Sequence, residues 1–91
     1  MTVLEYHAAY YPGEQGWYIV ELLDFPAVFS QGKTLKSARW MIKDALKLMA
    51  ESLIEEGKPL PKPNPRAKAG KKVILVEPVR LELRIHTPAR A

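Results

Sequence analysis

Few residues of this chain have side chains suited to catalysis, and they are scattered along it. The histidines, His7 and His86, lie near opposite ends of the chain. Imidazole is the side chain that most readily moves protons or binds zinc near neutral pH. Neither histidine has a cysteine or a pair of acids at ligand spacing, so we predict no metal site within one chain. If the first and last strands are neighbours, the two rings could approach each other. Otherwise both are partly exposed strand histidines with nothing to orient their rings.

Asp24 is the one acid inside a conspicuous motif, the rigid corner Asp24-Phe25-Pro26. A catalytic carboxylate works with a second acid, a metal or a positioned histidine. None is adjacent in the sequence, so Asp24 is predicted to accept hydrogen bonds from nearby turn amides. The serines have no adjacent base and no elbow glycines, and no glycine-rich loop opens a helix as phosphate binding requires. We therefore predict no catalytic residue and no cofactor.

The bulk composition predicts one small globular domain. The chain has 91 residues, 47% of them hydrophobic, and no cysteine. This length suits a single domain of modest stability. Without cysteine there are no disulfides, no cysteine-ligated zinc and no thiol catalysis, which fits a reducing cytoplasm. No apolar run approaches the roughly 20 residues that span a membrane, and the first residues carry no basic leader. We expect a cytoplasmic protein with no membrane association.

The charge is divided between the two parts of the chain. Residues 1–57 carry a net charge of −3, and residues 58–91 carry +7. A basic tail favours an anionic partner, although a solvated tail explains the charge equally well. Phosphate binding needs cations without precise spacing, whereas base readout needs interleaved aromatic residues, and residues 58–91 contain none. Non-specific binding of RNA or DNA is thus one hypothesis for the tail.

The local patterns predict an α+β fold with the order β-β-β-α-β, a small antiparallel sheet packed on one long helix. Period-two alternation predicts a strand over residues 2–11, and β-branched and aromatic residues predict a second over 17–23. Pro26 ends that strand, and residues 27–30 form a short third one. Gly32 lies in the next turn, where it is free to adopt a positive φ.

Thr34 is a good N-cap for a helix from residue 35 to about 56, and Gly57 ends it. One helical stripe is apolar: Leu35, Ala38, Ile42, Ala45, Leu46, Met49 and Leu53. Three further apolar residues, Trp40, Met41 and Leu48, lie off this stripe. They predict that the helix also meets a second surface.

The C-terminal third divides into a connector and a β region. Prolines at every second position make residues 58–70 an extended connector. Residues 71–86 return to a β pattern, which Pro78 is predicted to divide because one unbroken strand would be too long. The second part should be an edge or intersubunit strand with Arg80 and Arg84 outward. The predicted organisation is a core over 1–57, the connector, and C-terminal strands that complete the sheet or a dimer interface.

The central residues resemble those of the HicB-like antitoxin family. An aromatic strand, an acid before an apolar-proline pair, a Ser-Gln-Gly-x-Thr turn and an alanine-rich helix are its features. The chain matches at Trp17, Asp24, Pro26, Val28, Gln31, Gly32, Thr34, Leu35, Ala38, Asp44, Ala45 and Leu46, and again at Leu60-Pro61-Lys62-Pro63. The likeness covers about residues 3–63. It implies a degraded ribonuclease-H-like or double-stranded-RNA-binding-like fold, dimers or tetramers, and no catalysis.

The resemblance also implies a partner. Family members bind and silence a small HicA-type toxin that cleaves messenger RNA, and many carry a C-terminal DNA-binding segment. No such segment is visible after the connector here, so we do not expect operator binding by this chain alone. Ala27 stands where the family commonly has glycine, and Ser37 where glutamate often completes a capping box.

Together these observations predict a homodimeric, non-enzymatic binding protein that neutralises a HicA-type toxin. One helix cannot cover all the apolar surface. The candidate partner contacts are Trp17, Phe29, Trp40, Arg80 and Arg84. The alternatives are a protein that binds nucleic acid through its basic tail and a vestigial nuclease. The last would require a second carboxylate beside Asp24.

Overall fold

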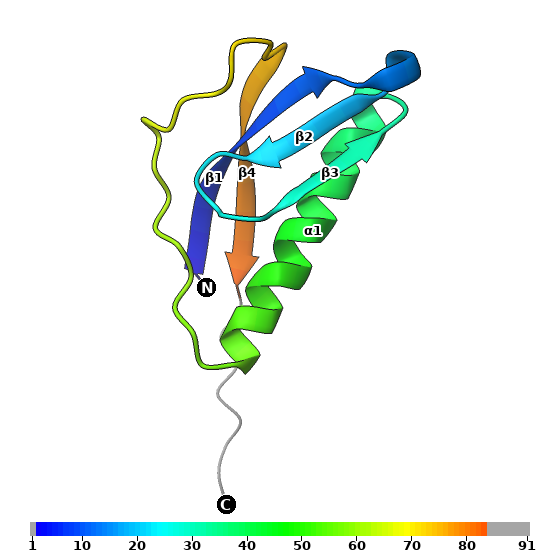
Figure 1. Ribbon diagram of the computed structural model, residues 1–91. Helices are drawn as coiled ribbons and strands as arrows, with labels where there is room; N and C mark the ends of the chain where they lie inside the picture. The colour runs from blue at the N-terminus through cyan, green and yellow to red at the C-terminus, as the bar shows by residue number, and fades with distance from the viewer. Residues whose placement is uncertain (1, 84–91) are drawn as a thin grey trace, which may run out of the picture.

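A four-stranded antiparallel sheet with one long helix across one face forms the protein (Figure 1). The computed structural model describes residues 2–83. The elements are β1 (Thr2–Pro12), the 3₁₀ turn η1 (Glu14–Gly16), β2 (Tyr18–Leu22), β3 (Phe29–Gly32), α1 (Leu35–Glu55) and β4 (Leu75–Leu83). The sheet order is β3-β2-β1-β4. This architecture confirms the predicted α+β fold, with the third strand beginning two residues later than expected.

The core lies between α1 and the face of the sheet that the period-two pattern makes apolar. Tyr6, Ala8 and Tyr10 of β1 are fully buried against the helix. The helical stripe supplies the other side through Ala38, Ile42, Leu46 and Ala50, each at most 1% exposed. Among residues 2–83, α1 is not apolar enough over its length to cross a bilayer.

Both ends of α1 are capped by residues that local sequence specifies. Thr34 Oγ1 accepts from the Ser37 amide, and Ser37 Oγ accepts from the Thr34 amide, each at 3.0 Å. Ser37 therefore completes the capping box itself, although glutamate is commoner at this place. At the other end Gly57 has φ +71° and the Lys58 amide donates to the Leu53 carbonyl, a Schellman motif.

Gly32 is required for a different reason than the sequence suggested. Its φ does not lie in the left-handed region. A Cβ at this position would lie 2.5 Å from both the Ala38 nitrogen and Ser37 Oγ. Gly32 therefore does not use the positive φ that a glycine is free to adopt there. Glycine is needed because the end of β3 approaches the first turn of α1 too closely for a side chain.

The prediction that Pro78 divides the last strand was also wrong, since β4 runs unbroken through it. Pro78 pairs with His7 of β1. The His7 amide and carbonyl both bond away from β4, to Asp24 and to Leu23. This pair is therefore a non-hydrogen-bonded one, and the missing N–H of Pro78 falls on the outer edge of the sheet.

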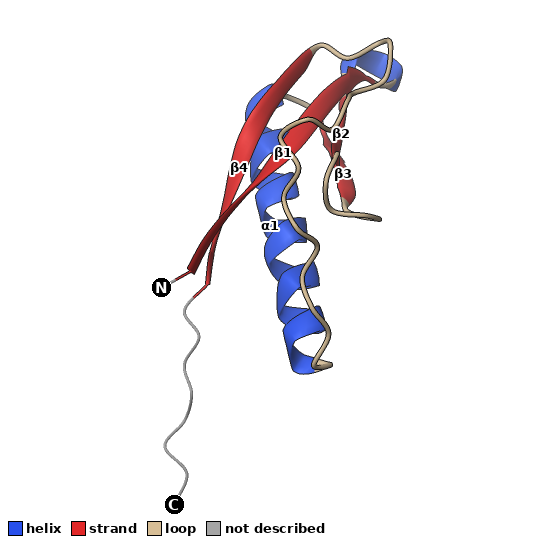
Figure 2. Cartoon of the chain, turned by 90° about the vertical axis from the view of Figure 1, so that its left-hand side faces the viewer, coloured by secondary structure: helices blue, strands red, loops and turns tan. Residues whose placement is uncertain are grey.

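The connector between α1 and β4 runs alongside β1 (Figure 2). It is held there by hydrogen bonds from side chains of the sheet. The Tyr6 hydroxyl donates to the Pro61 carbonyl at 2.6 Å, and the Tyr11 hydroxyl accepts from the Gly70 amide at 2.9 Å. These contacts bring the chain back so that β4 can pair with β1 over almost the whole length of both strands.

Candidate functional site

One exposed apolar surface lies where β3 meets α1. Phe29 is 69% exposed and Leu48 is 61% exposed. With Ala45 and Met49 they line a shallow hollow of about 350 Å³, which we name the β3–α1 patch. Leu48 was predicted to lie off the buried helical stripe, and it does. The patch has the composition of a protein contact, because exposed aromatic and aliphatic side chains gather there without charge.

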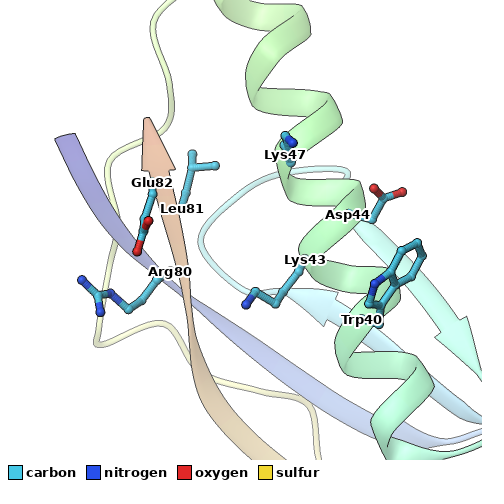
Figure 3. A pocket seen from close by; sticks show the side chains of 7 residues that line it. All are labelled: Trp40, Lys43, Asp44, Lys47, Arg80, Leu81 and Glu82. Carbon is cyan, nitrogen blue, oxygen red and sulfur yellow. The ribbon is translucent and has the colours of Figure 1, made fainter. Parts of the chain in front are cut away.

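A second surface lies between α1 and β4, which we name the β4–α1 groove. Its first half has a volume of about 310 Å³ and is lined by Trp40, Lys43, Asp44, Lys47, Arg80, Leu81 and Glu82 (Figure 3). Its second half, about 500 Å³, is lined by Lys47, Glu51, Ile54, Glu55, Leu81, Glu82 and Leu83. Figure 3 shows Leu81 on the side of β4 that faces α1 and Arg80 on the other side. On the helix side, the first half is mainly basic because of Lys43 and Lys47. The second half is mainly acidic on that side because of Glu51 and Glu55.

A clamp of two side chains lies beside the first half of this groove. Arg39 donates to both oxygens of Glu77, at 2.7 and 3.0 Å, and so joins α1 to β4. The hydrogen bond from Arg39 holds the pKa of Glu77 below its usual value. Burial, with Glu77 beside it, raises the pKa of the Tyr10 hydroxyl. The bidentate geometry makes the pair a positioning contact between two elements.

Asp24 is buried and joins three distant segments. Its side chain is 1% exposed. Its Oδ1 accepts a hydrogen bond from the backbone amide of His7 at 2.8 Å. Its Oδ2 accepts one from the backbone amide of Asn64 at 2.9 Å and lies 2.8 Å from Nδ1 of the His7 ring. The prediction that Asp24 bonds to nearby turn amides was therefore wrong. The expectation that nothing orients His7 was wrong too, because Asp24 fixes its ring.

This pair does not build a recognisable catalytic centre. The hydrogen-bond partners of Asp24 within residues 2–83 are His7 and Asn64, not a second carboxylate. Nor do those residues contain three His, Cys, Asp or Glu side chains grouped to hold a metal. The vestigial-nuclease hypothesis thus finds no support at Asp24. His86, the other histidine considered, lies outside the described residues.

The predicted partner contacts fall on separate surfaces. Trp40, 65% exposed, and Arg80 line the β4–α1 groove from α1 and β4 respectively, with the Arg80 side chain pointing away from α1, while Phe29 lies in the β3–α1 patch. Trp17 is half-buried, with the Lys33 ammonium 5.7 Å from its ring centroid. Arg84 lies outside the described residues. The sequence reading did not assign Lys43 and Lys47 to the groove, although their helical spacing from Trp40 was a usable signal.

A family model described as the HicB-like antitoxin of bacterial toxin–antitoxin systems matches residues 5–86. The chain belongs to this family. A UPF0150 protein of Thermoplasma acidophilum is 39% identical over 51 residues, which make up 56% of this chain and 74% of that protein. An uncharacterised 14.9 kDa protein of Haemophilus phage HP1 is 40% identical over 48 residues, 53% of this chain and 36% of the phage protein.

Solved structures of antitoxin HicB and of toxin–antitoxin complexes share the fold. The N-terminal domain of the Burkholderia pseudomallei antitoxin HicB aligns with TM-score 0.73 and 24% identity, over 88% of this chain and all of that one. A chain of a toxin–antitoxin complex from Streptococcus pneumoniae aligns with TM-score 0.70 and 18% identity, over 99% of this chain and 79% of that one. A chain of a HicA3–HicB3 complex reaches TM-score 0.58 and 25% identity, covering 66% and 69%.

Proposed function

We propose that this protein is a non-enzymatic antitoxin that binds and neutralises a HicA-type toxin, and that it works in the cytoplasm as a homo-oligomer. Its membership of the HicB-like family is the observation that carries the proposal. The occurrence of similar chains in toxin–antitoxin complexes supports it. Two exposed surfaces among the described residues, the β3–α1 patch and the β4–α1 groove, further support a role in protein contacts.

The β3–α1 patch is the proposed toxin-binding surface. Phe29 and Leu48 present large apolar side chains at its centre. Side chains of this kind supply most of the binding free energy in protein interfaces when water is excluded around them. The fold leaves them outside the core because Phe29 lies on an edge strand and Leu48 on the outer flank of α1.

Purification and growth rescue would test the proposal. The chain is co-expressed with any small HicA-type toxin that a neighbouring reading frame encodes, and the two are expected to co-purify and to restore growth. Phe29→Ala combined with Leu48→Ala should weaken toxin binding by about tenfold or more. Ile74→Ala is the matched control, because Ile74 is also an exposed aliphatic residue but lies near the start of β4.

Two results would contradict this function. If the purified chain neither binds nor neutralises the neighbouring toxin, the antitoxin assignment fails. If the Phe29 and Leu48 variant neutralises the toxin as well as the Ile74 variant does, the antitoxin function stands and the patch is the wrong surface.

A second candidate function is non-specific binding of nucleic acid by the basic C-terminal tail, whose described part includes the segment between α1 and β4. Its basic side chains are exposed along one extended segment: Lys62, Arg66, Lys68, Lys71 and Lys72. Binding by such a segment should fall steeply with salt, because each contact with a phosphate releases a counterion. Titration of generic RNA and DNA at about 50 and 200 mM salt tests this. Absence of binding at the lower salt would remove the hypothesis.

A further inference from the structure

Among residues 2–83, no strand pairs with the outer edge of β4, and this edge is interrupted at one position. The antiparallel register pairs Pro78 with His7, whose backbone groups bond away from β4. Because hydrogen-bonded and non-hydrogen-bonded pairs alternate along a strand, Pro78, Arg80 and Glu82 all direct their backbone groups outward. Pro78 has no N–H to offer, so it blunts the edge there. At Arg80 and Glu82 both N–H and C=O are presented to a neighbour.

We propose that a second copy of this chain pairs its β4 antiparallel with this open edge. The pairing is centred on Leu81, so that one sheet continues through both copies. In that register Arg80 lies opposite Glu82 of the second copy, and Glu82 lies opposite its Arg80. These are the residues with outward backbone groups, so both pairs are hydrogen-bonded ones, giving about four new backbone bonds. Each also sets a cation directly across from a carboxylate.

The side chains on the two faces of β4 fit this arrangement. Arg80 and Glu82 are exposed on the face away from α1, where neither needs to leave water completely. Leu81 is 4% exposed on the face toward α1 and would meet its own copy across the axis. A pairing one residue out of register would face outward backbone groups with inward ones, so the pleat excludes it.

The β4–α1 groove is self-complementary under the same two-fold axis. Leu81 and Lys47 line both halves of the groove, so the axis passes near its middle. The rotation brings the end of one groove that carries Trp40 and Lys43 toward the end of the other that carries Ile54 and the helix acids. An isologous interface requires such reversal of character about its centre.

A second copy fits this edge better than another protein, because the outward-facing residues of β4 up to Leu83 offer one cation, Arg80, and one carboxylate, Glu82, and a two-fold rotation pairs them. The inference rests on the self-association proposed above and specifies the surface that carries it. The β3–α1 patch lies at the opposite edge of the sheet. Toxin binding and self-pairing can therefore be tested separately.

Charge reversal with mixing tests the pairing. Arg80→Glu places two acids opposite each other at each charged pair, and Glu82→Arg places two bases there. Each variant alone should dissociate about tenfold or more readily than the parent protein in sedimentation velocity. An equimolar mixture of the two should regain dimer, because both pairs are then attractive, and the variant carrying both changes should also dimerise. Lys36→Glu and Glu14→Arg are the controls, since both residues are exposed and lie away from β4.

The mixture separates an interface effect from a folding effect. Arg80 lies beside Glu5 on β1 within one chain, and mixing cannot repair a repulsion there. If the parent protein dimerises and neither charge reversal weakens it, or if the mixture behaves like the single variants, the β4 pairing is refuted while self-association stands. A parent protein that stays monomeric at about 200 µM refutes both, a concentration that would populate a dimer of micromolar affinity. Growth rescue by either variant would show that the antitoxin function does not depend on the outcome.

Discussion

Replacing Asp24 should destabilise the fold more than replacing any exposed acid. Its carboxylate is the shared acceptor for the His7 amide of β1 and the Asn64 amide of the connector, and it also fixes the His7 ring. Asp24→Ala removes all three interactions at once. The backbone N–H groups of His7 and Asn64 then lose their acceptor in a partly buried position.

The expected cost is about 3 kcal/mol. An orphaned buried donor costs about 1–3 kcal/mol, and we take the lower part of that range because both amides are only partly buried. Two donors then account for about 2 kcal/mol, and the lost hydrogen bond to the imidazole ring adds about 1 kcal/mol. A chain of this size has a free energy of unfolding of roughly 5–14 kcal/mol, so the variant should fold but with a much smaller margin.

Urea unfolding followed by circular dichroism measures this change at fixed protein concentration. The midpoint should fall by about 2 M, since a small domain has a slope near 1.5 kcal/mol per molar urea. Asp44→Ala is the control, because Asp44 lies on α1 without a hydrogen bond to any described side chain, and its cost should stay within about 0.5 kcal/mol. A midpoint for Asp24→Ala as high as that of Asp44→Ala would refute the reasoning.

An isosteric change tests whether both carboxylate oxygens are needed. Asp24→Asn keeps one acceptor but directs an amide donor at either the His7 or the Asn64 N–H. We expect a loss close to that of Asp24→Ala, together with faster hydrogen exchange of the Asn64 amide. A wild-type midpoint for Asp24→Asn would show that one acceptor is sufficient.

Three further changes test the clamp and the turns around β3. Glu77→Gln should flatten the acid limb of the stability curve: Arg39 lowers the folded pKa of Glu77 below 4.5, so its contribution is present above pH 4.5 and lost as the pH falls through the folded pKa. Melting at pH 3 and pH 7 checks this, and an unchanged acid limb would contradict it. Gly32→Ala should lower the free energy of unfolding, measured in urea, by about 2 kcal/mol or more, because the added Cβ would overlap the start of α1. An unchanged urea midpoint would refute that overlap. Ala27→Gly should instead raise the free energy of unfolding by about 0.5–1 kcal/mol and so raise the urea midpoint, because Ala27 has φ +66°; a lower midpoint would show that no strain is stored there.

Local sequence predicted the elements well because their causes are local. Hydrophobic period, the Thr34 cap and the Gly57 stop depend on residues within a turn of one another. Those signals placed α1 within one residue of its observed end and confirmed the strand order along the chain. The third strand was predicted to begin at residue 27, two residues too early, because Ala27 adopts a left-handed conformation that alanine rarely adopts.

The errors share a physical origin in contacts between distant residues. The partners of Asp24 come from positions 17 and 40 residues away, so no window around the Asp-Phe-Pro corner contains them. Pro78 was expected to break a strand. A proline breaks a strand only where its nitrogen faces a neighbouring strand, and the pairing of Pro78 with His7 directs that nitrogen to the outer edge instead. The spacing of Lys43 and Lys47 from Trp40 indicated a shared helix face, but that β4 forms the other wall of the groove depends on its packing beside α1.

The two edges of the sheet differ in a way that suits two kinds of partner. The β3 edge is short, and an apolar patch flanks it at Phe29 and Leu48. The β4 edge is longer, closed by Pro78 in one part and charged in the other. An apolar patch can bind any partner of matching shape. A strand with a cation and a carboxylate two residues apart instead favours the same strand of a second copy, running antiparallel to it. If both proposals hold, self-pairing leaves the two β3 edges outermost, and each dimer presents a toxin-binding patch at either end of one continuous sheet. A complex of two antitoxin and two toxin chains is the stoichiometry that this geometry requires, and light scattering of the co-purified complex would measure it.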